Sequence, residues 1–468
     1  MPHKHSKKAK EKAKMAKFTR IPYNISEPLS AEKSAKLMSK RGKDRFLKEG
    51  TIIEGPDGQL NFAPTNEHGI KDPYGQTMLH LAANGNKETF FLFVIKGVEN
   101  KNPKDDEGST PLHNAASNGN LRICELIIEH VKDKNPKNDF GRTPLHNAAI
   151  HYAADKGHLQ VCQLIISNIQ DASPRDKQGL TPLHHVADQN HFEMCQLLLQ
   201  NVIDKNPKDD AGYTPLHFVS VKGYHRIFKL ISKEVAEINP RDDNATTPLH
   251  LAAKNGHLKI CQRILKRISE NEPKDICGLT PLHYAARNGH LEICQLIYEY
   301  VKNKNPSAND GITPLHEAAS NGHLPVVCLI SENTDDINPK NIDGITPFHA
   351  AVFDHHLHVC LKFLEIAKDI SPKDMNGQTP YHAAAAKGFV EVCKKFLESS
   401  KCKDENPKDN FGTTPLHLAA EHGRVGVFQL ILRNVEKKSP KDNHGKIPID
   451  YADGHKNILR IFHQFSSA

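Results

Sequence analysis

The sequence predicts a mainly α-helical solenoid, built from helix-turn-helix units that are joined by β-hairpin loops. Two observations predict it: a Thr-Pro-Leu-His tetrapeptide recurs along the 468 residues, and nearly every copy follows the previous one by 33 residues. A unit of that length buries too little apolar surface to fold alone, so such units stack into one continuous core. The tetrapeptide begins at Thr110, Thr143, Thr181, Thr214, Thr247, Thr280, Thr313 and Thr414, and variants begin at Thr77, Thr346 and Thr379.

Each unit contains the signals of its elements in chain order. Residues 206–212 hold Pro, Asp and Gly, which predicts a tight turn. Thr214 and Pro215 are suited to the N-cap and first turn of a helix, and Gly223 to its end. Residues 258–265 carry apolar side chains at helical spacing and predict a second helix with one buried face.

Two spacings depart from 33 residues: Thr143 to Thr181 is 38, and Thr379 to Thr414 is 35. The five extra residues of the longer spacing fall near 147–151, where His-x-Ala-Ala occurs twice. Five residues would rotate a continuous helix by about 140°. We therefore expect a bulge before a helix that restarts near His151, and a local weak point between the third and fourth units.

The 33-residue period and the Thr-Pro-Leu-His-x-Ala pattern resemble those of the ankyrin repeat, across residues 69 to about 465. The resemblance implies a curved solenoid that binds other proteins through its concave face as a scaffold, adaptor or regulatory subunit, without catalysis. It divides the chain into a basic head (1–26), a flanking segment with a possible helix (27–68) and the array (69–468). The degraded unit at Ile447–Asp450 is expected to be the C-terminal cap.

Partners of ankyrin arrays usually contact the hairpin tips and the exposed face of the first helix. The tips of the early repeats are mostly polar, whereas Ile276, Ile342 and Met375 lie at the tips of later ones. Aromatic and aliphatic residues at these positions predict an apolar strip on the concave side, since aromatic anchors dominate binding energy. The predicted partner-binding residues are Tyr213, Phe218, Leu251, Leu279, Tyr284, Ile312 and Ile345.

Ten cysteines and thirty histidines invite a metal or disulfide interpretation, but most of them recur at fixed repeat positions. Seven cysteines share one position in the second helix, where we expect small buried hydrophobic side chains and a reducing compartment. Cys277 and Cys402 fall in loops and are the more reactive candidates. The resemblance implies that eight histidines of the tetrapeptides tie the hairpin to the helix start: His113, His146, His184, His217, His250, His283, His316 and His417. His356 and Cys360 could share a helix face, but a metal site there is disfavoured because Cys360 is in the buried register, and no cofactor or metal is expected.

The formal charge of +7 is concentrated in the head: residues 1–20 hold eight basic residues and one acid, so the remaining chain sums to zero. This distribution argues against a folded body that binds nucleic acid through its own positive charge. Three uses of the head remain open: a solvated tail, a nuclear-import signal, or a weak contact with RNA, DNA or acidic lipid. The residues that would carry the last two are Lys7, Lys8, Lys10, Lys12 and Lys14.

Other classes of protein lack support in the sequence. The longest apolar run, Phe90–Ile95, is far shorter than the ~20 residues of a membrane span. No phosphate-binding loop, dinucleotide fingerprint or nucleophile elbow occurs, so an enzyme is not expected. We therefore expect a monomer in the cytoplasm or nucleus.

Overall fold

The computed structural model describes residues 50–54, 60–64, 71–85, 88–150, 156–402 and 404–466. These residues belong to two compact units, 1–111 and 112–468. The helix expected within residues 27–49 and the lysines of the head lie outside the described residues.

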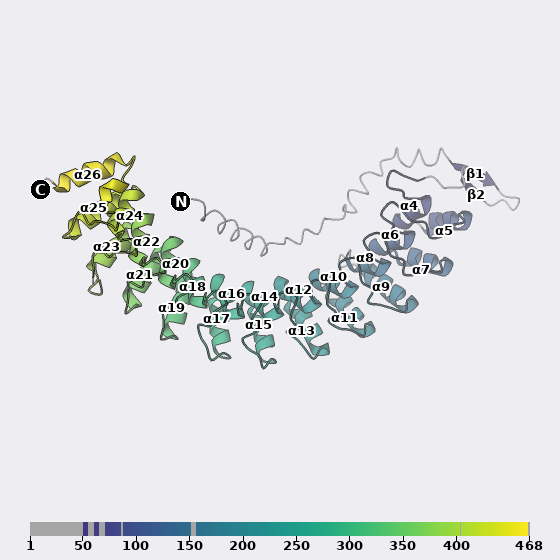
Figure 1. Cartoon of the computed structure of the whole chain (residues 1–468). Coiled ribbons are helices and arrows are strands. Elements are labelled where there is room, and N and C mark those ends of the chain that lie inside the picture. The colour runs from purple at the N-terminus through teal and green to yellow at the C-terminus, as the bar shows by residue number, and fades with distance from the viewer. Residues whose placement is uncertain are drawn as a thin grey trace. The chain divides into compact units, whose positions relative to one another are not determined.

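The first unit contains a strand pair and a helix pair (Figure 1). Strand β1 (Gly50–Glu54) is antiparallel to β2 (Leu60–Pro64), and Ile52 lies opposite Phe62. Strand β2 contacts α5 (Glu88–Gly97), which follows α4 (Met78–Asn84). The sequence analysis did not predict this hairpin, although Pro56-Asp57-Gly58 between its strands is a turn-forming sequence.

The second unit is a row of helix pairs that follow one another in chain order along a curve (Figure 1). The first helices line the inner side of this curve, and the second helices line the outer side. The first helices are α6 (Pro111–Ser117), α8 (Pro144–Ile150), α10 (Pro182–Asp188), α12 (Pro215–Lys222), α14 (Pro248–Lys254), α16 (Pro281–Arg287), α18 (Pro314–Ser320), α20 (Pro347–Phe353), α22 (Pro380–Lys387) and α24 (Pro415–Glu421). The second helices are α7 (Leu121–His130), α9 (Lys156–Asn168), α11 (Phe192–Asn201), α13 (His225–Glu234), α15 (Leu258–Leu265), α17 (Leu291–Tyr298), α19 (Leu324–Glu332), α21 (Leu357–Ile366), α23 (Val390–Glu398) and α25 (Val425–Asn434).

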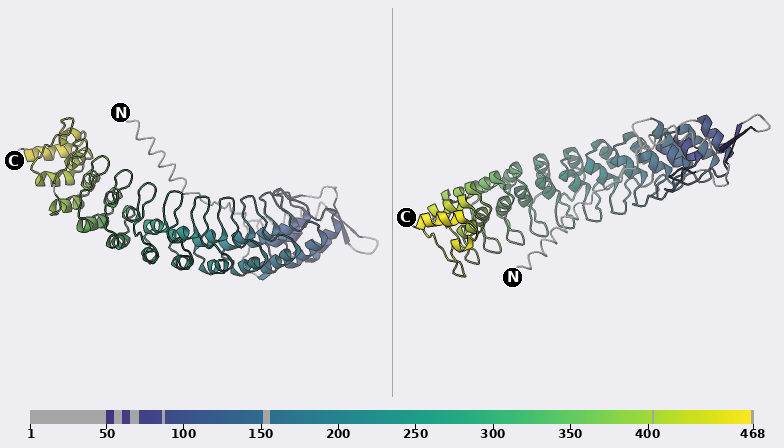
Figure 2. Two further views of the ribbon diagram at one scale, coloured as in Figure 1. Left: turned by 60° about the horizontal axis from the view of Figure 1, so that its bottom comes forward. Right: turned by 90° about the horizontal axis from the view of Figure 1, so that it is seen from above.

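The predicted solenoid is confirmed, and its core lies between neighbouring pairs. From α8 onward each first helix contacts the next first helix, as α14 contacts α16, and each second helix contacts the next second helix, as α15 contacts α17. Ile260, Cys261, Ile264 and Leu265 of α15 are buried at helical spacing, as expected of an amphipathic helix. The hairpin loops between pairs form a row along one edge of this unit (Figure 2).

Helix boundaries follow the sequence signals. Thr214 is the N-cap of α12 with an extended backbone, Pro215 is its first residue, and Gly223 ends it in the left-handed region at φ 78°. A Cβ atom at Gly223 would also lie 2.5 Å from the ring of His257 in the next repeat. Glycine is therefore required there both by the backbone conformation and by the neighbouring side chain.

The joint at the 38-residue spacing, which we call the irregular joint, departs from the regular repeat. Helix α8 has seven residues, as α6 and α10 do, so residues 147–150 of the predicted insert are regular helix. Helix α9 is described from Lys156 onward, and residues 151–155 lie outside the described residues.

The last repeat of the array has a short 3₁₀ helix, η1 (Pro448–Tyr451), followed by α26 (Lys456–Ser466). Asp450 occupies the position of the tetrapeptide histidine, and its Oδ2 accepts the amide N–H of Ile447 at 2.8 Å. A carboxylate thus replaces the imidazole as the acceptor at this helix start. Among the described helices, none is long and apolar enough to cross a bilayer.

Candidate partner-binding surface

The histidine of each tetrapeptide connects its helix to the hairpin of the following repeat. In the repeat of α12, Nδ1 of His217 accepts the N–H and the Oγ1–H of Thr214, both at 3.0 Å. Because Nδ1 accepts, the proton is on Nε2, which donates to the carbonyl oxygen of Thr246 at 3.2 Å. Burial lowers the pKa of His217 to about 4, so the imidazole is neutral at pH 7.

In most hairpins an Asp or Asn side chain at the start of the turn accepts backbone N–H groups of the same turn. Oδ1 of Asp209 accepts the amide N–H groups of Ala211 at 2.9 Å and Tyr213 at 2.7 Å. Successive hairpins are also joined directly, since the N–H of Asp243 donates to the carbonyl oxygen of Ala211 at 3.2 Å. Side chains on these loops are therefore presented from a hydrogen-bonded support rather than from free loops.

A row of cations, which we call the basic ladder, runs along the array just before the hairpins. Nζ of Lys208 donates to the carbonyl oxygen of Arg241 at 2.8 Å, and Arg241 in turn donates to that of Lys274 at 2.6 Å. Ser307 interrupts the row, because it accepts from Lys274 but has no cationic side chain. The members of the basic ladder are Lys137, Arg175, Lys208, Arg241, Lys274, Lys340, Lys373 and Lys408.

The predicted concave strip consists of the seven residues named in the sequence analysis. Leu279, Ile312, Ile345, Tyr213, Phe218 and Tyr284 are all half-buried, on hairpins or first helices of neighbouring repeats. The rings of Tyr213 and Phe218 meet edge to face, with centroids 5.9 Å apart.

The sequence analysis included Leu251 in the strip, but only 8% of this residue is exposed, so that assignment was wrong. A leucine at this position is covered by its neighbours, whereas the longer Phe218 and Tyr284 at the same repeat position keep half-exposed rings. Leu251 therefore offers little surface to a partner.

Tyr284 is held by polar contacts as well as by packing. Its hydroxyl donates to Oδ2 of Asp275 at 2.8 Å, and the guanidinium of Arg287 lies 5.8 Å from its ring centroid. Nε of Arg287 also donates to the buried Glu317 at 2.7 Å. The ring of Tyr284 is thus fixed in place before any partner arrives.

Several exposed apolar side chains lie at the hairpin tips, outside the predicted strip. Ile276 is 61%, Ile342 67% and Met375 68% exposed. The sequence analysis placed these three at tips, yet it gave greater weight to the aromatic residues of the first helices. Phe140 and Phe411 are also exposed at tips, and their position two residues after the turn carboxylate or amide was the available signal.

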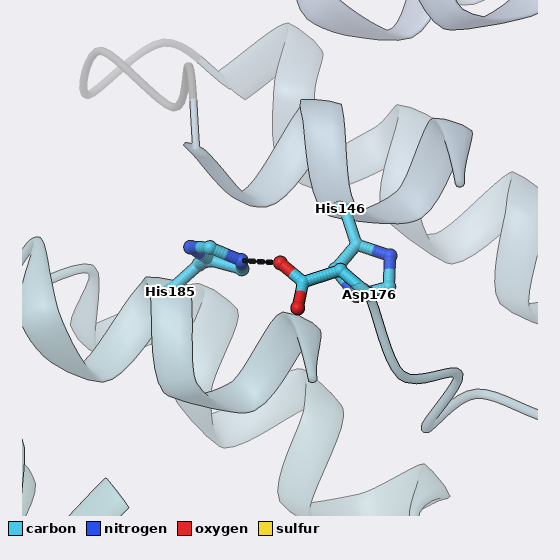
Figure 3. Close-up of side chains that lie close together, drawn as sticks. All are labelled: His146, Asp176 and His185. Carbon is cyan, nitrogen blue, oxygen red and sulfur yellow. Dashed lines mark ion pairs between the residues drawn. The ribbon is translucent and has the colours of Figure 1, made fainter. Parts of the chain in front are cut away.

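His146, Asp176 and His185 come together near the irregular joint (Figure 3). Nδ1 of His146 accepts from the amide of Thr143 and its Nε2 donates to the carbonyl oxygen of Leu180, so neither nitrogen is free to bind a metal. Nε2 of His185 lies 3.4 Å from Oδ2 of Asp176.

A cation competes for the same carboxylate, because Nε of Arg142 is 3.9 Å from Oδ2 of Asp176. Burial alone would raise the pKa of Asp176, but the nearby His185 imidazole and the hydrogen bond from the Gln178 amide lower it, which favours the carboxylate. The cluster is therefore an ion-paired group that leaves too few ligand atoms for a metal.

His355, His356 and Cys360, considered in the sequence analysis as a possible metal site, have structural roles. Nε2 of His356 donates to the carbonyl oxygen of Ser320 at 2.9 Å, and Cys360 is fully buried. His355 occupies a position where most repeats have glycine, with φ at 66°. These residues close a helix end and pack the core, so they do not offer a set of metal ligands.

The cysteines at the shared position of the second helices are buried, as predicted: Cys124, Cys162, Cys195, Cys261, Cys294, Cys360 and Cys393. Burial raises the pKa of Cys195 and Cys261 to about 12, so these thiols are protonated and inert at neutral pH. Cys277 is exposed, but partial desolvation of its thiol and the negative charges of Asp275 and Asp310 raise its pKa as well. Exposure alone therefore does not activate Cys277.

Family models for ankyrin repeats match most of the chain. A three-copy model matches residues 79–151, 150–242, 204–272, 225–310, 249–341 and 315–404, and a many-copy model matches 381–432. The chain belongs to the ankyrin-repeat family. A comparison with curated proteins gives no match. Ankyrin repeats are generally protein–protein interaction modules, and the ankyrin array described above is the part of this chain that can serve as one.

Proposed function

We propose that this ankyrin-repeat protein binds another protein through its concave strip and acts as a scaffold, adaptor or regulatory subunit. The observation that carries the proposal is the pair of half-buried aromatic residues, Phe218 and Tyr284, on first helices anchored by hydrogen-bonded hairpins. Aromatic side chains held in place before binding lose little conformational entropy when a partner covers them.

The test is a double variant, Phe218→Ala with Tyr284→Ala, in affinity purification from cell extract. We expect the proteins retained by the wild-type chain to be lost, while the circular dichroism spectrum stays that of a folded helical array. Ile203→Ala is the matched control, because Ile203 is fully exposed in the loop after α11, away from the first helices. Equal retention by the double variant and the wild type would exclude the concave strip as the interface.

A second candidate function is tethering through the head, which carries the whole net charge of +7 in its first twenty residues. Such a segment can contact a nucleic acid or an acidic membrane, or act as an import signal. The cysteines buried at one shared position of the second helices are consistent with a reducing compartment, and on that ground we propose a location in the cytoplasm or nucleus. We also propose that the protein is a monomer.

A further inference from the structure

One buried carboxylate of the array lacks a donor that several of its counterparts have. Oδ1 of Asp242 accepts the amides of Asn244 at 2.9 Å and Thr246 at 2.7 Å, as in other hairpins. Asp242 is only 6% exposed, and its Oδ2 is buried. This oxygen receives no hydrogen bond from the described residues. Among the described part of the chain, it is the one buried carboxylate oxygen without a donor.

Two equivalent carboxylates show what can fill this position. Oδ2 of Asp275 accepts the hydroxyl of Tyr284, and Oδ2 of Asp442 accepts that of Tyr451 at 2.5 Å. In both cases the donor stands nine residues after the carboxylate. The residue nine positions after Asp242 is Leu251, which has no polar atom to offer.

The surroundings of Asp242 suit a cation. Tyr213, from the preceding hairpin, is close enough that the charges of Asp242 and Asp209 help burial to raise its pKa to about 12. Burial, followed by the charges of Asp243 and Asp275, raises the pKa of Asp242 itself, which indicates a carboxylate short of positive charge.

The array's own nearby cations are engaged elsewhere. Lys208 donates to the carbonyl oxygen of Arg241, and Arg241 donates to that of Lys274 and pairs with Glu270 at 2.9 Å. Asp210 on the preceding hairpin and Asp243 on the same hairpin as Asp242 add two exposed acids. The missing donor would therefore come from outside the array.

We propose that Asp242, Tyr213 and Phe218 form a docking point for an arginine side chain of the partner protein. This proposal rests on the proposed function and specifies the chemistry of the partner: a basic segment with an arginine that reaches the concave strip. The guanidinium stacks on the half-buried rings of Tyr213 and Phe218 and donates to Oδ2 of Asp242. Because this oxygen is buried, docking requires the side chains that cover it to move. Arginine fits better than lysine, because its planar group can stack and donate at once.

The probe is a fluorescent peptide of alternating arginine and glycine, measured by fluorescence anisotropy with the purified full chain at physiological salt. Asp242→Asn keeps the Oδ1 acceptor for the turn and removes the charge. Leu251→Tyr supplies the hydroxyl that Tyr284 gives to Asp275, so it fills the acceptor from within. We expect each variant to weaken binding by about tenfold or more, as for a partly desolvated charged pair.

Asp243→Asn is the matched control, because it removes the same charge from the exposed neighbour of Asp242. We expect it to change affinity by less than threefold. The same peptide with citrulline in place of arginine should not bind.

Three results would overturn the proposal: no binding of the arginine peptide, equal losses for Asp242→Asn and Asp243→Asn, or unchanged binding by Leu251→Tyr. The proposed function has a separate readout. Loss of cellular partners in the Phe218 and Tyr284 double variant, but not in Asp242→Asn, would retain the interface and reject the arginine.

Discussion

Nε2 of His217 donates to the carbonyl oxygen of Thr246, which lies in the hairpin of the next repeat. The same link recurs with His250 and Leu279, His283 and Ile312, and onward along the array. Since each imidazole also caps its own helix start through Nδ1, one neutral side chain joins a turn, a helix and the neighbouring repeat. The stability of the array should therefore depend on these imidazoles remaining unprotonated.

The first prediction is that acid destabilises the array well above the usual range for carboxylate titration. Burial lowers the pKa of His217, His250, His349 and His382 to about 4, against about 6.5 in an unfolded chain. The unfolded chain thus binds protons between pH 6.5 and 4 that the native state does not, so stability is complete above pH 6.5 and falls toward pH 4. At pH 5 we expect a loss of about 2 kcal/mol for each such histidine.

Urea unfolding followed by circular dichroism at pH 7.5 and pH 5 measures this loss. His250→Asn is the informative variant, because it lowers stability at both pH values but removes one titrating group. Its pH dependence should be shallower than that of the wild type. Identical unfolding midpoints for the wild type at pH 7.5 and pH 5 would contradict the prediction.

A second prediction concerns Ala245, which has a left-handed backbone at φ 56° where most hairpins have glycine, such as Gly212 and Gly278. A left-handed backbone conformation destabilises alanine by ~1–2 kcal/mol relative to glycine. Glycine loses more conformational entropy on folding, which offsets part of this difference. Ala245→Gly should therefore stabilise the array by about 0.5–1 kcal/mol. Thermal melting of the variant beside the wild type checks this, and a lower melting temperature would refute it.

The reverse substitution, Gly212→Ala, provides the comparison. It imposes the same backbone cost, and its new Cβ atom would lie 2.7 Å from Oδ1 and 2.8 Å from the amide nitrogen of Asp243. We expect Gly212→Ala to destabilise the array by more than Ala245→Gly stabilises it.

The third prediction addresses the 38-residue spacing. Deletion of residues 151–155 restores a 33-residue interval between Thr143 and Thr181 and lets α8 and α9 connect as the other pairs do. We expect amides of residues 146–158 to exchange with deuterium faster than those of the matching segment in the next repeat, and the deletion to remove that difference. Uniform protection in the wild type would mean that the joint is as stable as the others.

The fourth prediction separates the head from the array. Deletion of residues 2–20 removes the whole formal charge of +7 and leaves a chain that sums to zero. The truncated chain should elute from a heparin column at lower salt than the full chain, because heparin is a polyanion that binds clustered basic side chains electrostatically. Its thermal melting should be unchanged, and equal elution of the two chains would place basic surface on the array.

Much of this fold could be predicted from the sequence because the same local signals recur. Thr214 and Pro215 begin α12 and Gly223 ends it, as their capping preferences predict. The burial of Cys261 and its counterparts followed from their shared position on an apolar helix face. Repetition made these inferences safe, since an error at one repeat would contradict many others.

The candidate site was less predictable, because it depends on contacts between repeats. Leu251 and Tyr284 share one repeat position, but the leucine is covered while the tyrosine reaches Asp275 and keeps an exposed face. A periodic pattern identifies a position and says nothing of the side chains that the neighbouring repeats place over it. The unpartnered oxygen of Asp242 was invisible for the same reason, since its absent donor is defined only by comparison with Tyr284 and Tyr451.

The basic ladder gives the array a direction. Lys208 and His217 donate toward the C-terminus, whereas His257 donates back to the carbonyl oxygen of Val221. The N-terminal and C-terminal faces of a repeat are therefore different surfaces. Each is complementary to the opposite face of a neighbouring repeat, but not to a second copy of the same face. A chain cut between repeats would expose one face of each kind, and such fragments could associate only head to tail. Because that contact does not close on itself, their natural product is an open filament rather than a dimer.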